Sequence, residues 1–167
     1  MAQMRQRVLV TTSSEDTESV GAEIGARLGP GDVIDLRGEL GAGKTQFVRG
    51  LARGLGIAQG VRSPTYTICQ LHAGRVPLLH VDAYRLEDSR ELLLHGWDDL
   101  AARAVVAVEW GDRLGPLLPE RRLQVSVAHS GESRRTLRFE AFGGFEFAGG
   151  AGDGSSWWGP AEEPRGS

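Results

Sequence analysis

The sequence predicts a single α/β domain with a central mixed, largely parallel sheet flanked by helices and with antiparallel C-terminal strands. Three observations predict this fold class. Strand-like and helix-like hydrophobic patterns alternate along the chain, and a glycine-rich segment at 38–45 joins one such strand to one such helix. The chain has 167 residues and 40% hydrophobic content, which is enough for one core but too little for two ordinary domains.

The first elements follow from changes in hydrophobic period, with Gly or Pro between them. A stripe of Val20, Ile24 and Leu28 marks a helix, whereas alternation with period two marks the strands. The expected elements are a strand at 7–11, a helix that starts with capping-box spacing at 12–15 and stops at 29–31, a strand at 32–37, and a helix at 46–53 that ends at 54–56.

The later elements are mostly strands. Short apolar or alternating runs are separated by turn residues, which is typical of a sheet with hairpin connections. The expected elements are strands at 66–72 and 76–82 with a hairpin turn at 73–75, a short helix at 88–94, a buried strand at 104–108, and strands at 122–128 and 135–142 joined by a turn at 130–132.

The composition changes at Gly143. Beyond it the chain is rich in glycine, acidic residues and serine, carries a Trp157-Trp158 pair, and has no hydrophobic period. Such a segment is typical of a chain that does not form its own core. We therefore expect one domain over residues 1–142 and a disordered or weakly docked tail over 143–167.

Charge and cysteine content exclude some classes of protein. A net charge of −3 argues against a free-standing DNA- or RNA-binding protein, which would normally have a strongly basic face. Cys69 is the single cysteine, so there is no internal disulfide, and its place in an alternating apolar run predicts core packing in a reducing compartment. No signal peptide and no run of 18 apolar residues is visible, so we expect a cytoplasmic protein without a membrane span.

The segment Gly38-Glu39-Leu40-Gly41-Ala42-Gly43-Lys44-Thr45 matches the phosphate-binding pattern G-x-x-x-x-G-K-[ST] in full. Its Lys44 is the only lysine among 19 basic residues. A phosphate cradle needs a compact ammonium on a flexible stem, which a planar guanidinium does not replace. The segment therefore predicts a nucleotide-binding loop in a P-loop NTPase-like domain.

Each residue type in this loop has a physical role. The glycines allow backbone turns that direct successive N–H groups inward, and the following helix adds its positive dipole end. Lys44 can reach the β- and γ-phosphate oxygens, and the Thr45 hydroxyl can coordinate Mg²⁺.

A phosphate loop also needs an acidic group that holds the metal from the other side of the triphosphate. Asp82 and Glu109 each follow a core strand, and ligands of open α/β sheets bind at the carboxyl ends of the strands. We assign Glu109 to Mg²⁺, directly or through water, and Asp82 to orienting the attacking water or sensing the γ-phosphate. Either acid could instead cap a helix or pair with an arginine.

Three neighbouring residues have two interpretations each. Arg85 could stabilise transferred charge, but a simple ion pair is favoured. Trp110 packs either beside the nucleotide or in the core. His80 is more typical of a hydrogen-bonded structural imidazole than of a catalyst.

Four ordered motifs give a resemblance to a known family. They are GELGAGKT at 38–45, Ser63-Pro64-Thr65-Tyr66, the run from His80 to Arg85, and Val108-Glu109-Trp110-Gly111. Together they resemble the TsaE family, also called YjeE, over roughly Val8 to Phe142. This resemblance implies an ATPase of low intrinsic activity that joins two partner proteins, TsaB and TsaD. In that family the partners transfer the threonylcarbamoyl group to adenosine 37 of tRNA.

The resemblance also implies site residues. ATP would bind on Glu39, Leu40, Gly41, Ala42, Gly43, Lys44 and Thr45, with Mg²⁺ at Thr45 and Glu109 and a required acid at Asp82. Thr65 falls in a switch-like loop, and Trp110 lies where the family has a tryptophan near the nucleotide. Thr12 and its neighbours, together with Arg134, are expected to frame the adenine.

Other function classes also use a phosphate-binding loop. A GTPase that reads guanine with Asn-Lys-x-Asp is excluded, because the chain has no asparagine and no second lysine. A small-molecule kinase shares the loop but needs an acceptor pocket and an arginine-bearing lid. A nucleotide-gated binding module, in which occupancy and not turnover matters, is the third possibility.

Overall fold

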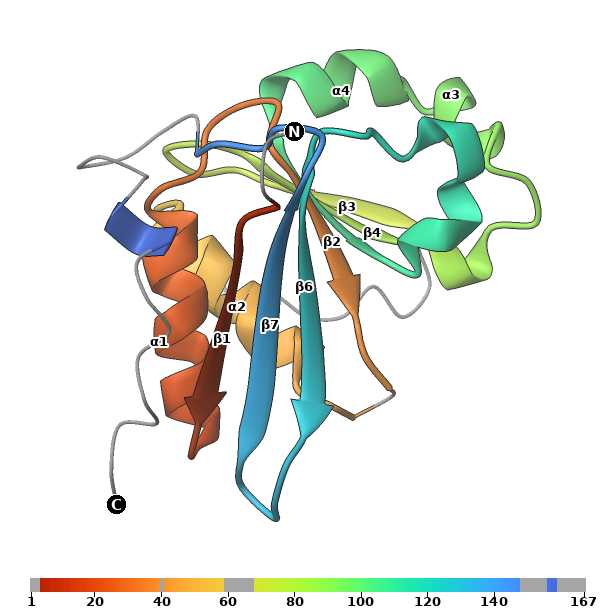
Figure 1. The fold of residues 1–167 in the computed structure, drawn as a ribbon. Coiled ribbons are helices and arrows are strands. Elements are labelled where there is room, and N and C mark those ends of the chain that lie inside the picture. The colour runs from red at the N-terminus through yellow and green to blue at the C-terminus, as the bar shows by residue number, and fades with distance from the viewer. Residues whose placement is uncertain (1–3, 40, 59–67, 148–155, 159–167) are drawn as a thin grey trace.

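The structure, a computed structural model, describes residues 4–39, 41–58, 68–147 and 156–158. Its strands form one mixed sheet in the order β1-β7-β6-β2-β5-β4-β3 (Figure 1). The strands are β1 (Gln6–Thr11), β2 (Val33–Arg37), β3 (Cys69–His72), β4 (Leu78–Asp82), β5 (Val105–Glu109), β6 (Arg122–His129) and β7 (Arg135–Phe142). The four central strands are parallel, and both edges of the sheet are antiparallel. The expected mixed, largely parallel sheet is confirmed.

Helices connect these strands. They are α1 (Ser14–Gly25), α2 (Lys44–Gly54), α3 (Glu91–Leu94) and α4 (Trp97–Arg103), with 3-10 turns η1 (Ala83–Arg85), η2 (Gly111–Leu117) and η3 (Ser156–Trp158). The sequence patterns did not predict α4 or η2. Both are short, and short segments carry too few turns to display a helical period.

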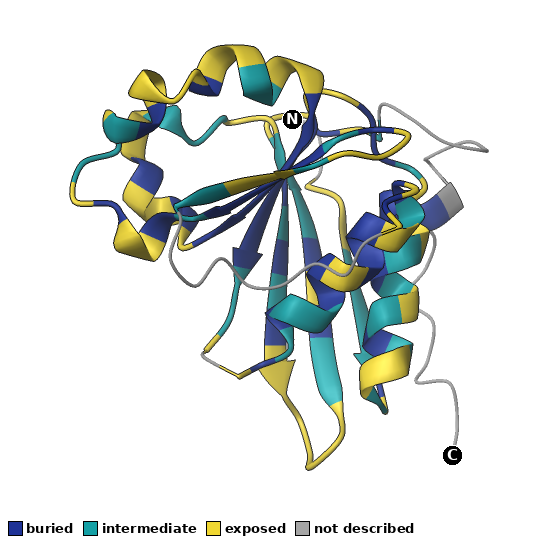
Figure 2. Ribbon diagram, turned by 180° about the vertical axis from the view of Figure 1, so that it is seen from behind, coloured by how far each residue is buried: buried dark blue, intermediate teal, exposed yellow. Residues whose placement is uncertain are grey.

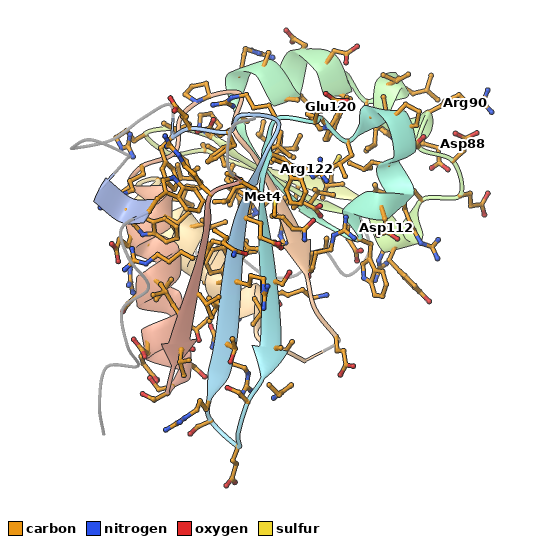
Figure 3. The ribbon with its side chains drawn as sticks, in the orientation of Figure 1. Met4, Asp88, Arg90, Asp112, Glu120 and Arg122 are labelled. Carbon is orange, nitrogen blue, oxygen red and sulfur yellow. The ribbon has the colours of Figure 1, made fainter. Side chains whose placement is uncertain are left out.

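The structure refines both ends of the first helix and the start of the third. α1 ends at Gly25, ahead of the stop expected at 29–31. Ser13, and not Thr12, caps α1, because its hydroxyl accepts a hydrogen bond from the amide of Asp16 at 3.0 Å. The helix α3 is shorter than the expected 88–94. Asp88 and Arg90 precede it as an exposed ion pair at the outer edge of the molecule (Figure 3).

Each face of the central sheet is covered by a separate core. On β2, Ile34 and Leu36 pack beneath α1 and α2, whereas Val33 belongs to the core beneath α3, α4 and η2. β5 is buried along its whole length, and β2 and β4 are buried except at their last residues; Figure 2 shows these buried residues in dark blue. Burial on both faces is the usual condition of parallel strands.

Glycines bring α1 and α2 into direct backbone contact. A Cβ on Gly50 would lie 2.0 Å from the carbonyl oxygen of Glu18, and one on Gly21 would lie 2.3 Å from the carbonyl oxygen of Phe47. The two helices can approach this closely only because these positions lack side chains. Since α2 carries the phosphate-binding loop at its N-terminus, this contact also fixes where the loop lies.

Part of the segment after residue 142 packs on the domain. Trp157 is 2% exposed and meets the ring of Phe139 edge-on, with 4.8 Å between centroids. The guanidinium of Arg7 lies 4.8 Å from the Trp157 ring centroid, and Phe145 is also buried. These described residues therefore differ from the expected disordered or weakly docked tail, because their aromatic side chains complete the core of the sheet face on which α1 and α2 pack. The domain boundary at residue 142 stays a prediction.

In the part of the chain that the structure describes, no helix combines the length and the apolarity that crossing a bilayer requires.

Replacement of Gly50 by alanine tests the helix contact. Alanine has the higher helix propensity by about 1 kcal/mol, so propensity alone predicts a gain in stability. The contact predicts the opposite, because the atoms facing the new methyl group are backbone. We expect Gly50→Ala to lower the free energy of unfolding by about 1–3 kcal/mol in urea denaturation followed by circular dichroism. Ser19→Ala, at an exposed position of α1, is the control. A Gly50→Ala protein as stable as the unchanged one would contradict the close approach.

Candidate nucleotide-binding site

The loop between β2 and α2 has the conformation that its glycines allow. Gly38, Gly41 and Gly43 have φ values of 147°, 79° and 108°, in the left-handed region that side chains disfavour. The amide of Ala42 donates to the carbonyl of Glu39 at 3.1 Å, a hydrogen bond within the loop. α2 begins directly after Gly43, so its unpaired N-terminal amides open onto the loop. Leu40 lies outside the described residues.

Lys44 folds back over this loop. Its Nζ donates to the carbonyl of Gly38 at 2.9 Å and lies 3.9 Å from Oε1 of Glu109. The side chain is only 8% exposed. The ammonium thus lies between the start of the loop and an acidic group on β5, where a polyanion bound to the loop would be within its reach.

A cavity of about 300 Å³ opens beside the loop. It brings together most of the residues expected from the sequence, and its lining consists of Gly41, Gly43, Lys44, Thr45, Gln46, Asp82, Glu109 and Trp110. The parallel register of β4 and β5 pairs Asp82 with Glu109, so both acids leave the sheet at its carboxyl edge. That edge is where open α/β sheets bind ligands.

A second cavity, of about 330 Å³, lies at the other end of the sheet, near Met4 and the end of β7 (Figure 3). Its two charged side chains, Arg5 and Glu146, are paired with each other at 3.6 Å. It contains neither the glycine loop nor the strand-end acids, so the candidate nucleotide site is the cavity beside the loop.

Asp82 has local partners as well as a place in the cavity. Its Oδ1 accepts from the amide of Tyr84 at 3.1 Å, and its Oδ2 lies 3.6 Å from Nε of Arg85. The favoured interpretation of Arg85 as an ion-pair partner is therefore confirmed. This pairing restrains the carboxylate at the cavity, so the ion pair with Arg85 is compatible with a carboxylate that faces a ligand.

Glu109 is buried and hydrogen-bonded to His80, whose Nε2 lies 3.2 Å from its Oε2. Burial disfavours the charged form of Glu109, but the hydrogen bond from His80 and the charges of His80 and Lys44 outweigh burial. The pKa of Glu109 therefore lies below its ordinary value. His80 is the hydrogen-bonded imidazole that its sequence position suggested.

Trp110 forms the outer wall of the cavity and is not a core residue. It is 41% exposed, its ring centroid lies 5.2 Å from that of Tyr84, and Lys44 Nζ lies 5.4 Å from its ring. With φ at 60°, it is the one non-glycine residue in the described ranges with a left-handed backbone. A bulky residue in this conformation is uncommon and costs about 1–3 kcal/mol, a form of strain that is frequent at functional sites.

The expected adenine-framing residues do not line the cavity. Thr12 is exposed, with its amide donating to Asp16, and Arg134 is exposed in the turn before β7. They do lie at the same edge of the sheet as the loop, because Thr11 pairs with Arg135. The Ser63-Pro64-Thr65-Tyr66 motif lies outside the described residues.

The oxygen donors at the cavity fit Mg²⁺. Thr45 offers a hydroxyl, and Asp82 and Glu109 offer carboxylates, which are the hard ligands that this ion prefers. The low pKa of Glu109 keeps its carboxylate ionised at neutral pH. Within the described ranges no three His, Cys, Asp or Glu residues gather closely enough to hold a metal by themselves. Mg²⁺ at such a site takes its remaining ligands from phosphates and water.

Sequence reasoning did not identify two contacts. His80 lies two residues before Asp82 on β4 and hence on the same face, so period-two alternation could have placed it beside Glu109. Arg135 donates from Nε to the carbonyl of Ala42 at 2.9 Å, across 93 residues of sequence. No local pattern reveals a contact that depends on the order of strands in the sheet.

The His80 contact predicts how the pKa of Glu109 responds to substitution. His80→Leu removes the donor and should raise this pKa, whereas His80→Gln keeps an N–H group near the position of Nε2 and should raise it less. The measurement is a carboxyl-carbon NMR titration of Glu109, with His72→Gln as control. Since folding lowers this pKa, the carboxylate stabilises the fold at neutral pH, and that contribution is lost as the pH falls through the folded-state pKa. Equal pKa values in all four proteins would exclude the contact.

Comparison with known proteins agrees with this geometry. The family model of the threonylcarbamoyl adenosine biosynthesis protein TsaE matches residues 11–137. A relative from Bacillus subtilis, named tRNA threonylcarbamoyladenosine biosynthesis protein TsaE, is 41% identical over 142 residues, which cover 84% of this chain and 89% of the relative. A protein of the same name from Treponema pallidum is 37% identical over 129 residues, which cover 77% and 96%. The crystal structure of YdiB from Bacillus subtilis has a TM-score of 0.70 and 33% identity, and the match covers 86% of this chain and 90% of that one. The chain therefore belongs to the TsaE family and has its P-loop NTPase-like fold.

Proposed function

We propose that this protein is a Mg²⁺-dependent ATP-binding protein and slow ATPase required for the N6-threonylcarbamoyladenosine modification of tRNA at adenosine 37. It acts on a complex of the TsaB and TsaD counterparts and does not itself transfer the threonylcarbamoyl group. One observation carries the proposal: in a TsaE-family chain, the phosphate-binding loop, its lysine and two strand-end acids line a single cavity.

The loop binds the phosphates. Its inward amides and the positive end of α2 attract a polyanion, and the ammonium of Lys44 exchanges the Gly38 carbonyl for phosphate oxygens. The flexible stem of Lys44 allows this exchange without movement of the backbone. Trp110 lies beside Lys44 and shields the phosphates from bulk water on the open side of the cavity.

Thr45 and Glu109 would hold the metal, and Asp82 would orient the attacking water. The chemistry that Mg²⁺ would supply there is neutralisation of charge that develops on the phosphates. His80 keeps the Glu109 carboxylate directed toward the cavity, and Arg85 restrains Asp82. Positioning and electrostatics supply nearly all the acceleration, because phosphoryl transfer needs little covalent chemistry from the protein.

The charge balance of the cavity favours slow turnover. Among the described residues that line it, Lys44 carries the one positive charge, against the carboxylates of Asp82 and Glu109. A phosphoryl-transfer site that lacks a further cation is slow, and a partner that supplies one accelerates it strongly. The proposed role in a complex with TsaB and TsaD rests on this balance and on family membership. The cytoplasmic location stays a prediction, and direct contact with tRNA is not part of the proposal.

Lys44→Ala should weaken nucleotide binding strongly while leaving the fold intact. Loss of a charged hydrogen-bond donor to phosphate corresponds to roughly 10- to 100-fold weaker binding of ADP, measured by isothermal titration calorimetry. Lys44→Arg should not restore it, because the guanidinium is too large and planar for the loop. Arg103→Ala, an exposed arginine on α4, is the control, and circular dichroism checks folding of all variants. ADP affinity in Lys44→Ala equal to that of the unchanged protein would remove Lys44 from this role.

The rate of ATP hydrolysis should depend on partners. We expect slow phosphate release by the isolated protein and an increase of roughly tenfold or more when purified TsaB and TsaD counterparts are added together. Asp82→Asn and Glu109→Gln should abolish the increase. Hydrolysis that is fast in isolation and indifferent to partners would refute the proposal. Phosphate transfer to an added small molecule would identify a kinase, and assembly with partners on ATP without turnover would identify a nucleotide-gated adaptor.

A further inference from the structure

Arg135, at the start of β7, is bound to the phosphate-binding loop. Its Nε donates to the carbonyl oxygen of Ala42 at 2.9 Å. The same guanidinium donates from Nη1 to the carbonyls of Arg134 at 3.0 Å and Glu132 at 3.4 Å. One side chain thus links three main-chain carbonyls, two in the β6–β7 turn and one in the loop.

The sheet order makes this link possible. β6 lies between β7 and β2, so the side chain of Arg135 crosses one strand to reach the loop. A Cβ on Gly43 would lie 3.7 Å from Arg135 Nε and 3.8 Å from Cγ1 of Val127. Arg135 and β6 therefore form the wall against which the loop rests at Gly43.

The contact fixes the direction of a neighbouring amide. The described residues contain no cis peptide bonds, and a trans peptide is planar, with its C=O and N–H pointing in opposite directions. Arg135 holds the Ala42 carbonyl toward β7. The N–H of Gly43, in the same peptide, therefore points away from β7. Gly43 also lines the cavity, and an amide that points away from β7 can reach an anion bound there.

We propose that Arg135 is a positioning residue for phosphate binding: by holding the Ala42 carbonyl, it orients the Gly43 amide toward the phosphates. This inference rests on the proposed nucleotide-binding function. The role is indirect, because Nε and Nη1 of the guanidinium already donate to main-chain carbonyls. The amide of Ala42 is itself bonded to Glu39, so its orientation has a separate cause.

A pair of nearly isosteric variants isolates the hydrogen bond. Gln places an amide nitrogen at the chain position of the arginine Nε, and Met places a methyl group there; neither carries a charge. We expect Arg135→Met to bind ADP about five- to tenfold more weakly than the unchanged protein, the loss that corresponds to one hydrogen bond. Arg135→Gln should stay within about twofold. Arg138→Met, at an exposed position of the same strand, should bind ADP normally.

The outcomes separate the inference from the proposed function. Failure of the unchanged protein to bind ADP overturns both. Normal ADP binding by Arg135→Met overturns the role of Arg135 alone. Equal weakening in the Gln and Met variants also overturns it, because charge would then matter in place of the hydrogen bond.

An NMR measurement on the unchanged protein makes the test independent of how the variants fold. With ADP added, the Gly43 amide proton should move downfield as it donates to phosphate, while the Arg135 Nε–H resonance keeps its hydrogen-bonded position. In Arg135→Met saturated with ADP, the ADP-induced shift at Gly43 should still be smaller, a change that weaker binding alone would not produce. A Gly43 resonance that does not move when the unchanged protein is saturated with ADP overturns the inference.

Discussion

The backbone of the glycine loop, described at residues 38, 39 and 41–43, is the constraint on which the rest of the site depends. Three left-handed glycines allow its shape, but they also make it flexible, so other contacts have to hold it. Ala42 is held by hydrogen bonds to Glu39 within the loop and to Arg135 from outside it. Lys44 bonds to the carbonyl of Gly38 and ties the end of the loop to its beginning. The close contact of α2 with α1 then fixes the helix that carries the loop.

The acidic side of the cavity depends on strand register in a similar way. Asp82 and Glu109 are paired residues of adjacent parallel strands, so neither loop flexibility nor helix packing determines their separation. Arg85 restrains the carboxylate of Asp82, and His80 restrains the carboxylate of Glu109. The two carboxylates, held by paired strands, thus face the glycine-rich loop across the cavity. This division suits a site in which the protein must keep its charges in place while the phosphates enter and leave.

The local patterns predicted much of this molecule because the relevant signals lie within a few residues of one another. The strand at β2, the glycine loop and α2 are contiguous, and both acids follow apolar runs that end at them. Short elements such as α4 span too few residues to show a hydrophobic period. The segment after residue 142 showed no such period because its buried residues, Phe145 and Trp157, are isolated in the sequence. An isolated aromatic residue is buried only where the rest of the fold leaves apolar core surface uncovered. The residues next to it in the sequence do not reveal where that surface is.

The sequence by itself determined which groups meet at the candidate site: a glycine-rich loop with a single lysine, a threonine hydroxyl, and two carboxylates at strand ends. It could do so because these groups are set by residue type and by spacing within a short segment. Only the tertiary structure decided that His80 supports Glu109, that Arg134 lies outside the cavity, and that Arg135 holds the loop. Those relations follow from the order β7-β6-β2-β5-β4, and strand order arises from long-range packing that no local pattern contains.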